Sequence, residues 1–148
     1  MKNLFEAGTV AEVMARIERL QPGALRQWGK MDVAQMMAHC SAGLEMASGK
    51  LIAKRTLLGR MIGPHVRHML TNDKPMPRNS PTAKELKVSS CDFQRERQRL
   101  RECVQRFYEG GEAQCTKHPH PFFGPLTPIE WSTGMYKHLD HHLRQFGA

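Results

Sequence analysis

The sequence lacks the local patterns that mark several common classes of protein. No apolar run approaches the roughly 20 residues that span a bilayer, and no hydrophobic stretch follows Lys2, so neither a membrane span nor a secretory leader is expected. A glycine-rich phosphate loop, a dinucleotide fingerprint and a nucleophile elbow are all missing. These absences argue against nucleotide-dependent and serine-hydrolase chemistry, and they favour a cytoplasmic protein.

Cysteine is sparse and never paired as C-x-x-C, which argues against a dithiol redox motif or a zinc ribbon. Cys40 follows His39 directly, but neighbours in a helix point about 100° apart, so this thiol is a poor candidate for a shared metal site. We predict that the cysteines are reduced and mainly structural. They are Cys40, Cys91, Cys103 and Cys115.

The chain has 148 residues, enough for one domain spanning residues 1–148. Its net charge of +8 permits binding to nucleic acid, an anionic surface or an acidic small molecule. Part of the excess lies in residues 50–67. Another part lies in residues 95–101, where Glu96 and Glu102 are interleaved with arginines, as is typical of a solvated helix face. A basic helical module that binds nucleic acid or another polyanion, without catalysis, remains an alternative to an enzyme.

Strong helix signals occur at four places, each followed by apolar residues at helical spacing. The predicted starts are the capping box Thr9-Val10-Ala11-Glu12, Asp32 with Gln35, Asp92, and Thr127-Pro128-Ile129-Glu130. Glycine is expected to end the second helix at Gly49 and the third at Gly110-Gly111.

The middle of the chain has no clean period. Gly59, Gly63 and Pro64 are expected to break residues 51–70 into one or two short helices. Residues 71–81 are rich in proline and predict a long surface loop that continues to residue 90. With no convincing strand, the sequence predicts an all-α fold, an up-down four-helix bundle with a broken middle helix and a long loop.

Two histidines stand one turn apart in the last helix. At about 100° per residue, His138 and His142 fall on one flank of the apolar stripe and face partly inward. His141 falls on the charged side and is expected to be exposed. The apolar stripe consists of Met135, Leu139, Leu143 and Phe146.

A third histidine has a similar setting in the second helix. His39 lies about 110° from the centre of that helix's apolar stripe, with Gln35 one turn before it. Because inward flanks meet in a bundle, we predict a metal site formed by His39, His138 and His142. Three imidazoles suit zinc, nickel, iron or copper, and three protein ligands leave positions open for water or substrate, as in catalytic sites. Gln35 and Gln145 are candidates for orienting ligands or substrate.

Other interpretations of the histidines stay open. An H-x-x-x-H spacing is common, and exposed pairs usually bind nothing. Leu139 and Asp140 fill the positions between His138 and the histidines that follow, so the H-E-x-x-H helix of metalloproteases is excluded. A structural site closed by a fourth ligand, such as His141 or a cysteine, is a further alternative. No role is assigned to His65, His68, His118, His120 or His141, although the 118–123 loop could form part of a pocket wall and a surface turn is favoured there.

Three segments resemble a known group of proteins. Trp28 followed by Asp32-Val33-Ala34-Gln35-Met36-Met37-Ala38-His39-Cys40 is similar to the first signature helix of the DinB-like superfamily. The segment His138-Leu139-Asp140-His141-His142-Leu143-Arg144-Gln145 is similar to the last one. Residues 118–131, with Pro121-Phe122-Phe123-Gly124-Pro125-Leu126-Thr127 and Glu130-Trp131, resemble a branch catalogued only as a domain of unknown function.

The resemblance implies an up-down four-helix bundle, often dimeric, in which three histidines hold a divalent metal; they match His39, His138 and His142. Characterised members include transferases and isomerases that use low-molecular-weight thiols. The implied function is therefore a metal-dependent enzyme of the thiol-transferase or hydrolase type that acts on a small molecule through zinc, nickel or iron. A homodimer is a candidate assembly, whereas a membrane or nucleic acid is not an expected partner.

Overall fold

The computed structural model describes residues 1–78 and 92–148, and this part of the chain is all-α, as predicted. It contains no strand within these ranges, and an isolated bridge joins His120 and Gly124. The helices are α1 (Ala7–Arg19), α2 (Val33–Ala47), α3 (Leu57–Val66), α4 (Phe93–Gly110) and α5 (Pro128–Gln145), with short 3-10 helices η1 (Arg67–Leu70) and η3 (Glu112–Gln114).

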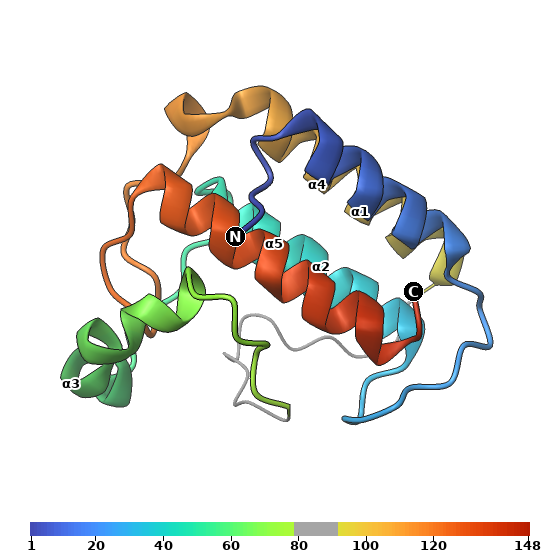
Figure 1. Cartoon of the computed structure of the whole chain (residues 1–148), viewed down its shortest axis with the longest axis horizontal. Helices are drawn as coiled ribbons and strands as arrows, with labels where there is room; N and C mark the ends of the chain where they lie inside the picture. Colours follow the sequence, from blue (N-terminus) through green and yellow to red (C-terminus); the bar gives the residue numbers. More distant parts are fainter. Residues whose placement is uncertain (79–91) are drawn as a thin grey trace.

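Four helices, α1, α2, α4 and α5, form the bundle. Each packs against two others: α2 and α1 both contact α4 and α5. Figure 1 shows that α1 and α5 run in one direction while α2 and α4 run in the other. The contact of Arg16 with Asp140, near the C-terminal ends of α1 and α5, agrees with this. The connection between α2 and α4 therefore starts and finishes at opposite ends of the bundle.

Three of the predicted helix starts are confirmed. A side-chain oxygen of Asp32, Asp92 and Thr127 accepts a hydrogen bond from the backbone N–H three residues later in each case. At Asp32 and Thr127, the side chain three residues later (Gln35 and Glu130) also accepts a hydrogen bond from the backbone N–H of the capping residue, which completes a capping box. Such caps are local chemistry, each contributing about 1 kcal/mol, and they are therefore readable from sequence.

The predicted start of the first helix is wrong. Helix α1 begins at Ala7, and its N-cap, Glu6, makes no side-chain capping bond. Thr9 is buried inside the first turn, where its hydroxyl donates to the Glu6 carboxylate at 3.1 Å. Leu4 is fully buried just ahead of the helix. Packing of the segment before Thr9 thus sets the start, in place of the capping box that the sequence pattern suggested.

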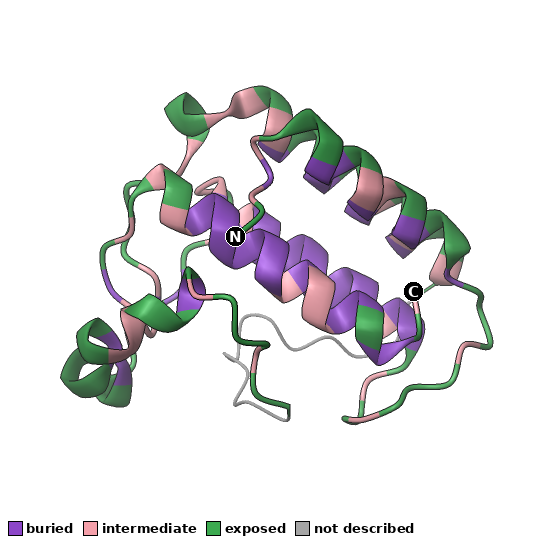
Figure 2. Cartoon of the chain, viewed as in Figure 1, coloured by how far each residue is buried: buried purple, intermediate pink, exposed green. Residues whose placement is uncertain are grey.

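The core lies between the four bundle helices. Helix α2 is buried along nearly its whole length, and Figure 2 shows α2 and α5 as the most enclosed elements. Phe5, just before α1, stacks on Phe107 of α4 with ring centroids 5.4 Å apart. None of the helices in the described ranges combines the length and hydropathy needed to cross a membrane.

The middle segment forms short helices, as predicted, but the glycines do not break them. Gly59, Gly63 and Pro64 all lie inside α3. The structure explains this by close backbone contact, because a Cβ added at Gly63 would lie 1.9 Å from the carbonyl oxygen of Phe122. Residues 71–78 form a loop, as expected, and the predicted continuation over residues 79–90 lies outside the described residues.

Candidate metal centre

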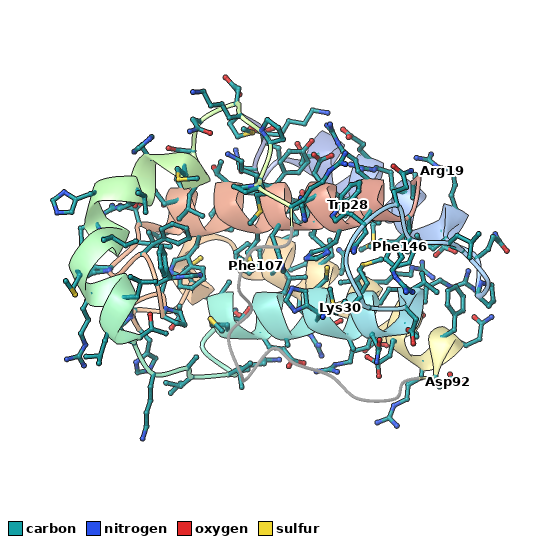
Figure 3. The ribbon with its side chains drawn as sticks, turned by 90° about the horizontal axis from the view of Figure 1, so that it is seen from below. Arg19, Trp28, Lys30, Asp92, Phe107 and Phe146 are labelled. Carbon is teal, nitrogen blue, oxygen red and sulfur yellow. The ribbon has the colours of Figure 1, made fainter. Side chains whose placement is uncertain are left out.

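The structure brings His39, His138 and His142 together. His39 comes from α2, and His138 and His142 come from successive turns of α5. Figure 3 shows the ribbons of α5 and α2 side by side. Each side chain offers one ring nitrogen, and these three atoms lie within 4.8 Å of one another. His39 and His142 are buried and His138 is partly buried. This grouping could hold a metal ion.

The three rings meet edge to face around a common centre. Ring centroids lie 4.8 Å apart for His39–His138, 4.8 Å for His39–His142 and 4.7 Å for His138–His142, at steep interplanar angles. The Nε2 atoms of His39 and His138 are 2.8 Å apart. Tetrahedral zinc with Zn–N bonds of about 2.0–2.1 Å requires a separation of about 3.3 Å between ligand nitrogens. A combined outward movement of about half an ångström, shared between the two rings, gives that spacing.

A glycine in α2 makes room for the cluster. Gly43 follows His39 by one turn, and a Cβ added there would lie 3.3 Å from Nδ1 of His138. That is tighter than ordinary carbon contacts, so any side chain at this position presses on the imidazole. The lack of a side chain at Gly43 therefore lets α2 approach α5 at the histidines without displacing the His138 ring. Sequence reasoning did not identify this residue, and its one-turn spacing from His39 is the only signal that could have done so.

Gln145 fixes the protonation of one histidine. Its amide nitrogen donates to the carbonyl oxygen of Trp28 at 2.6 Å, which turns its Oε1 toward Nδ1 of His142 at 2.8 Å. Because an amide oxygen only accepts, Nδ1 of His142 must carry the proton, and its Nε2 is left with a free lone pair. The same contact holds the 21–31 loop, where Gly29 has a φ of +80° and a Cβ would lie 2.6 Å from Gln145 Nε2.

Burial keeps two histidines of the cluster, His138 and His142, uncharged. Loss of solvent, together with the neighbouring imidazole of His39, lowers the pKa of His142 to about 3. Burial also lowers the pKa of His138 well below its usual value, with His142 and His39 adding to the effect. Both rings are therefore neutral near pH 7, which is the form that ligates metals.

The prediction that His141 is exposed is wrong, because the structure shows it half-buried. Its Nε2 accepts a hydrogen bond from the indole nitrogen of Trp28 at 3.4 Å, and its ring lies 5.0 Å from that of His142. It does not belong to the group of ring nitrogens that converge. The bond from Trp28 to His141 therefore connects the 21–31 loop to α5 next to the cluster. On the same indole ring, the guanidinium of Arg78 lies 4.2 Å from the ring centre.

Gln35 has a structural role at the start of α2. Its Oε1 accepts from the backbone N–H of Asp32 at 3.0 Å, and this bond is half of the capping box. It lies one turn before His39, as predicted. A part for Gln35 in orienting a ligand or substrate stays a prediction.

The thiols in the described residues are free, as predicted. Cys40 is buried next to His39, and its sulfur points to that of Met36 at 3.7 Å. Burial raises the pKa of Cys40, and it raises the pKa of Cys115 to about 11. These thiols are protonated and are not ready metal ligands. Cys91 lies outside the described residues.

The segment around His120 forms a turn beside the bundle. Nδ1 of His120 accepts from the backbone N–H groups of Phe122 and Phe123 at 3.1 and 3.2 Å. Its ring lies 5.3 Å from that of Trp131, and burial lowers its pKa to about 4. The surface turn favoured from sequence is thus present, with His118 exposed and His120 partly buried.

The fold and this cluster define a helical-bundle protein with a three-histidine site that could hold a metal ion. The chain belongs to the family described as "Protein of unknown function (DUF1569)", whose profile matches residues 3–148. No curated protein and no solved structure matches the chain.

Proposed function

We propose that the chain is a metal-dependent enzyme in which His39, His138 and His142 hold a divalent transition metal. The observation that carries this proposal is the convergence of three imidazole nitrogens from two helices within 4.8 Å. Zinc, nickel or iron suits such a donor set better than magnesium, which prefers oxygen ligands. We further propose that the family lies within the DinB-like superfamily, on the resemblance of its first and last signature helices.

The residues around the cluster fit a metal in three respects. The imidazoles of His138 and His142 are neutral near pH 7, because burial lowers their pKa values. The proton on Nδ1 of His142, held by Gln145, leaves Nε2 free to ligate. Both Nε2 atoms of the His39–His138 pair already face each other, so at most one of them carries a proton. Metal binding replaces that shared contact.

Three protein ligands leave coordination positions open, which is the arrangement of catalytic and not of structural sites. A metal bound here would bind a thiol or water and lower its pKa, which generates a nucleophile near neutral pH. Within the described residues no fourth histidine, cysteine or carboxylate joins the group. This supports the enzyme over a closed structural site, and it favours thiol transfer or hydrolysis on a small molecule.

Several arginines are engaged in ion pairs and are therefore less available to bind a polyanion, which weakens the case for a polyanion-binding module. Arg67 pairs with Glu130, and Arg99 pairs with Glu45. Other pairs link Arg16 and Arg144 to Asp140 and Arg101 to Glu18. Part of the helical positive charge is thus neutralised locally, with Asp140 serving both Arg16 and Arg144.

Metal-loaded protein tests the proposed function. Protein loaded separately with zinc, nickel or iron is assayed for transfer of low-molecular-weight thiols to electrophiles and for hydrolysis of small esters and amides. His142→Ala is the test variant, and His68→Ala, an exposed histidine outside the cluster, is the control. We expect metal-dependent turnover in the wild type and in His68→Ala, and its loss in His142→Ala. Equal turnover in His142→Ala, or none with any metal, contradicts the proposal.

A further inference from the structure

Helix α3 is attached to the protein by its glycines. Gly59 and Gly63 are buried and lie against the backbone of residues 121–123, where an added Cβ at Gly59 would come within 2.6 Å of Phe122 Cα. The backbone N–H of Thr56 donates to the Pro121 carbonyl at 3.0 Å at the start of the helix. Backbone contact holds α3 in place, without the apolar side chains that normally face a core.

The apolar side chains of α3 point outward. Leu57 is 78% exposed and Met61 is 73% exposed, and Leu58 and Ile62 are also exposed. At about 100° per residue these four side chains cover an arc of about 140°, opposite the two glycines. Figure 1 shows α3 projecting from one end of the bundle, and Figure 2 shows it largely exposed. The apolar side of this helix thus faces solvent, opposite to the usual arrangement, and it contributes little to the protein's own fold.

The surroundings of this face are basic. Residues 46–72 contain no aspartate or glutamate. Arg60 of α3 is exposed, and so is Lys54, two residues before the N-cap Thr56. Arg60 lies on the flank of the apolar arc, between the outward and the glycine faces. The "α3 face", meaning Leu57, Leu58, Met61 and Ile62 with Lys54 and Arg60, therefore combines aliphatic and cationic groups, with no acidic residue in the same segment of the chain.

We propose that the α3 face docks on an anionic phospholipid surface. Aliphatic side chains on a projecting ridge gain free energy by entering the boundary between headgroups and acyl chains, while nearby lysine and arginine side chains bind anionic headgroups. A single helix of 10 residues gives weak and reversible attachment, and does not span the bilayer.

Two other occupants fit the α3 face less well. A second copy of the chain, related by a two-fold axis, would bring Lys54 and Arg60 of both copies into one interface, and residues 46–72 supply no acid to balance them. Nucleic acid would satisfy the cations, but it offers no hydrocarbon for leucine and methionine, and α3 carries no phenylalanine, tyrosine or tryptophan for base stacking.

Vesicle co-sedimentation of the full chain tests the proposal. The probes are phosphatidylcholine vesicles with and without phosphatidylserine, at low and at physiological salt. The variants are Leu57→Ser with Met61→Ser, and Lys54→Gln with Arg60→Gln. Leu25→Ser is the control, because Leu25 is 88% exposed but lies in the 21–31 loop. Helical circular dichroism and thermal melting confirm that each variant is folded.

We expect the wild type and Leu25→Ser to bind vesicles that contain phosphatidylserine, and to bind less as salt rises. The partition coefficient of each double variant should be lower than that of the wild type by a factor of about ten or more. Binding that is independent of phosphatidylserine, or unchanged in both double variants, overturns the proposal. So does a dimer in analytical ultracentrifugation that dissociates in Leu57→Ser with Met61→Ser while vesicles bind none of the proteins. The proposal does not depend on the metal site.

Discussion

Oε1 of Gln145 lies 2.8 Å from Nδ1 of His142, one turn away on α5. The amide of Gln145 cannot rotate freely, because its nitrogen is bound to the Trp28 carbonyl at 2.6 Å. A loop residue thus sets the orientation of an amide, and the amide sets which nitrogen of His142 is free. These two hydrogen bonds, which we call the Gln145 relay, link the 21–31 loop to the candidate metal centre. Gln145 is therefore well placed to influence metal affinity without being a ligand.

Replacing Gln145 separates its two hydrogen bonds. Gln145→Leu removes both, and we expect metal affinity to fall about 10- to 100-fold, as is typical when a ligand histidine loses its hydrogen-bonding partner. Gln145→Glu keeps an acceptor for His142 Nδ1 but loses the donor to Trp28. It should bind metal more tightly than Gln145→Leu. Competition titration against a chelator measures both affinities, and equal affinities in wild type and Gln145→Leu would show that the relay is unimportant.

Two helical glycines give a matched pair of substitutions. Gly8→Ala in α1 places the new methyl group in open space, so we expect the free energy of unfolding to rise by about 0.5–1 kcal/mol. Gly43→Ala places it 3.3 Å from His138 Nδ1, so the gain should be offset by displacement of the imidazole. Urea unfolding and metal titration compare the two variants. Unaltered metal affinity in Gly43→Ala would mean that the ring yields freely.

The metal-free protein should lose stability as the solution becomes mildly acidic. His120 is neutral in the folded state because burial lowers its pKa to about 4, whereas in the unfolded chain it titrates near 6.5. As the pH falls, the unfolded state therefore binds the proton first. The contribution of His120 to the free energy of unfolding is full above pH 6.5 and is lost as the pH falls toward 4. The slope approaches about 1.4 kcal/mol per pH unit for this one group.

His120→Asn isolates this contribution. The asparagine oxygen can accept from the backbone N–H groups of Phe122 and Phe123 as Nδ1 of His120 does, but it does not titrate. Unfolding titrations between pH 6.5 and 4 should show a shallower fall for the variant than for wild type. Identical slopes would place the acid sensitivity in other groups.

A buried lysine fastens the middle segment to α5. Nζ of Lys137 donates to the carbonyl oxygens of Met69 and Asn72 and to Oδ1 of Asn72. Lys137→Met keeps the aliphatic stem and leaves these acceptors unpaired, so we expect a loss of about 1–3 kcal/mol in the free energy of unfolding. Lys117→Met, at an exposed lysine, should change it by less than about 0.5 kcal/mol. Similar losses in both variants would argue against the anchor.

The sequence predicted those features that depend on local chemistry. Asp32, Asp92 and Thr127 cap their helices through hydrogen bonds within four residues, so their pattern is visible in the chain. The convergence of His39 with His138 and His142 followed from helical angles, because bundle packing makes inward flanks meet.

Features set by distant contacts could not be predicted. Helix α1 starts before Thr9 because the preceding segment packs into the core, which no local motif records. Gly63 reads as a helix breaker in isolation, but in the fold it lets α3 touch the backbone of Phe122. The link from Gln145 to Trp28 joins residues on a helix and a loop far apart in the chain, and the angle of Gln145 alone did not reveal it.

The measurement that tests the central claim most directly is elemental analysis of untagged protein purified without added metal, with His39→Ala and His142→Ala alongside. The account predicts a near-stoichiometric transition metal in the wild type and its loss in both variants, while circular dichroism shows the helices retained. A wild-type protein that contains no transition metal and takes up none on titration would contradict it.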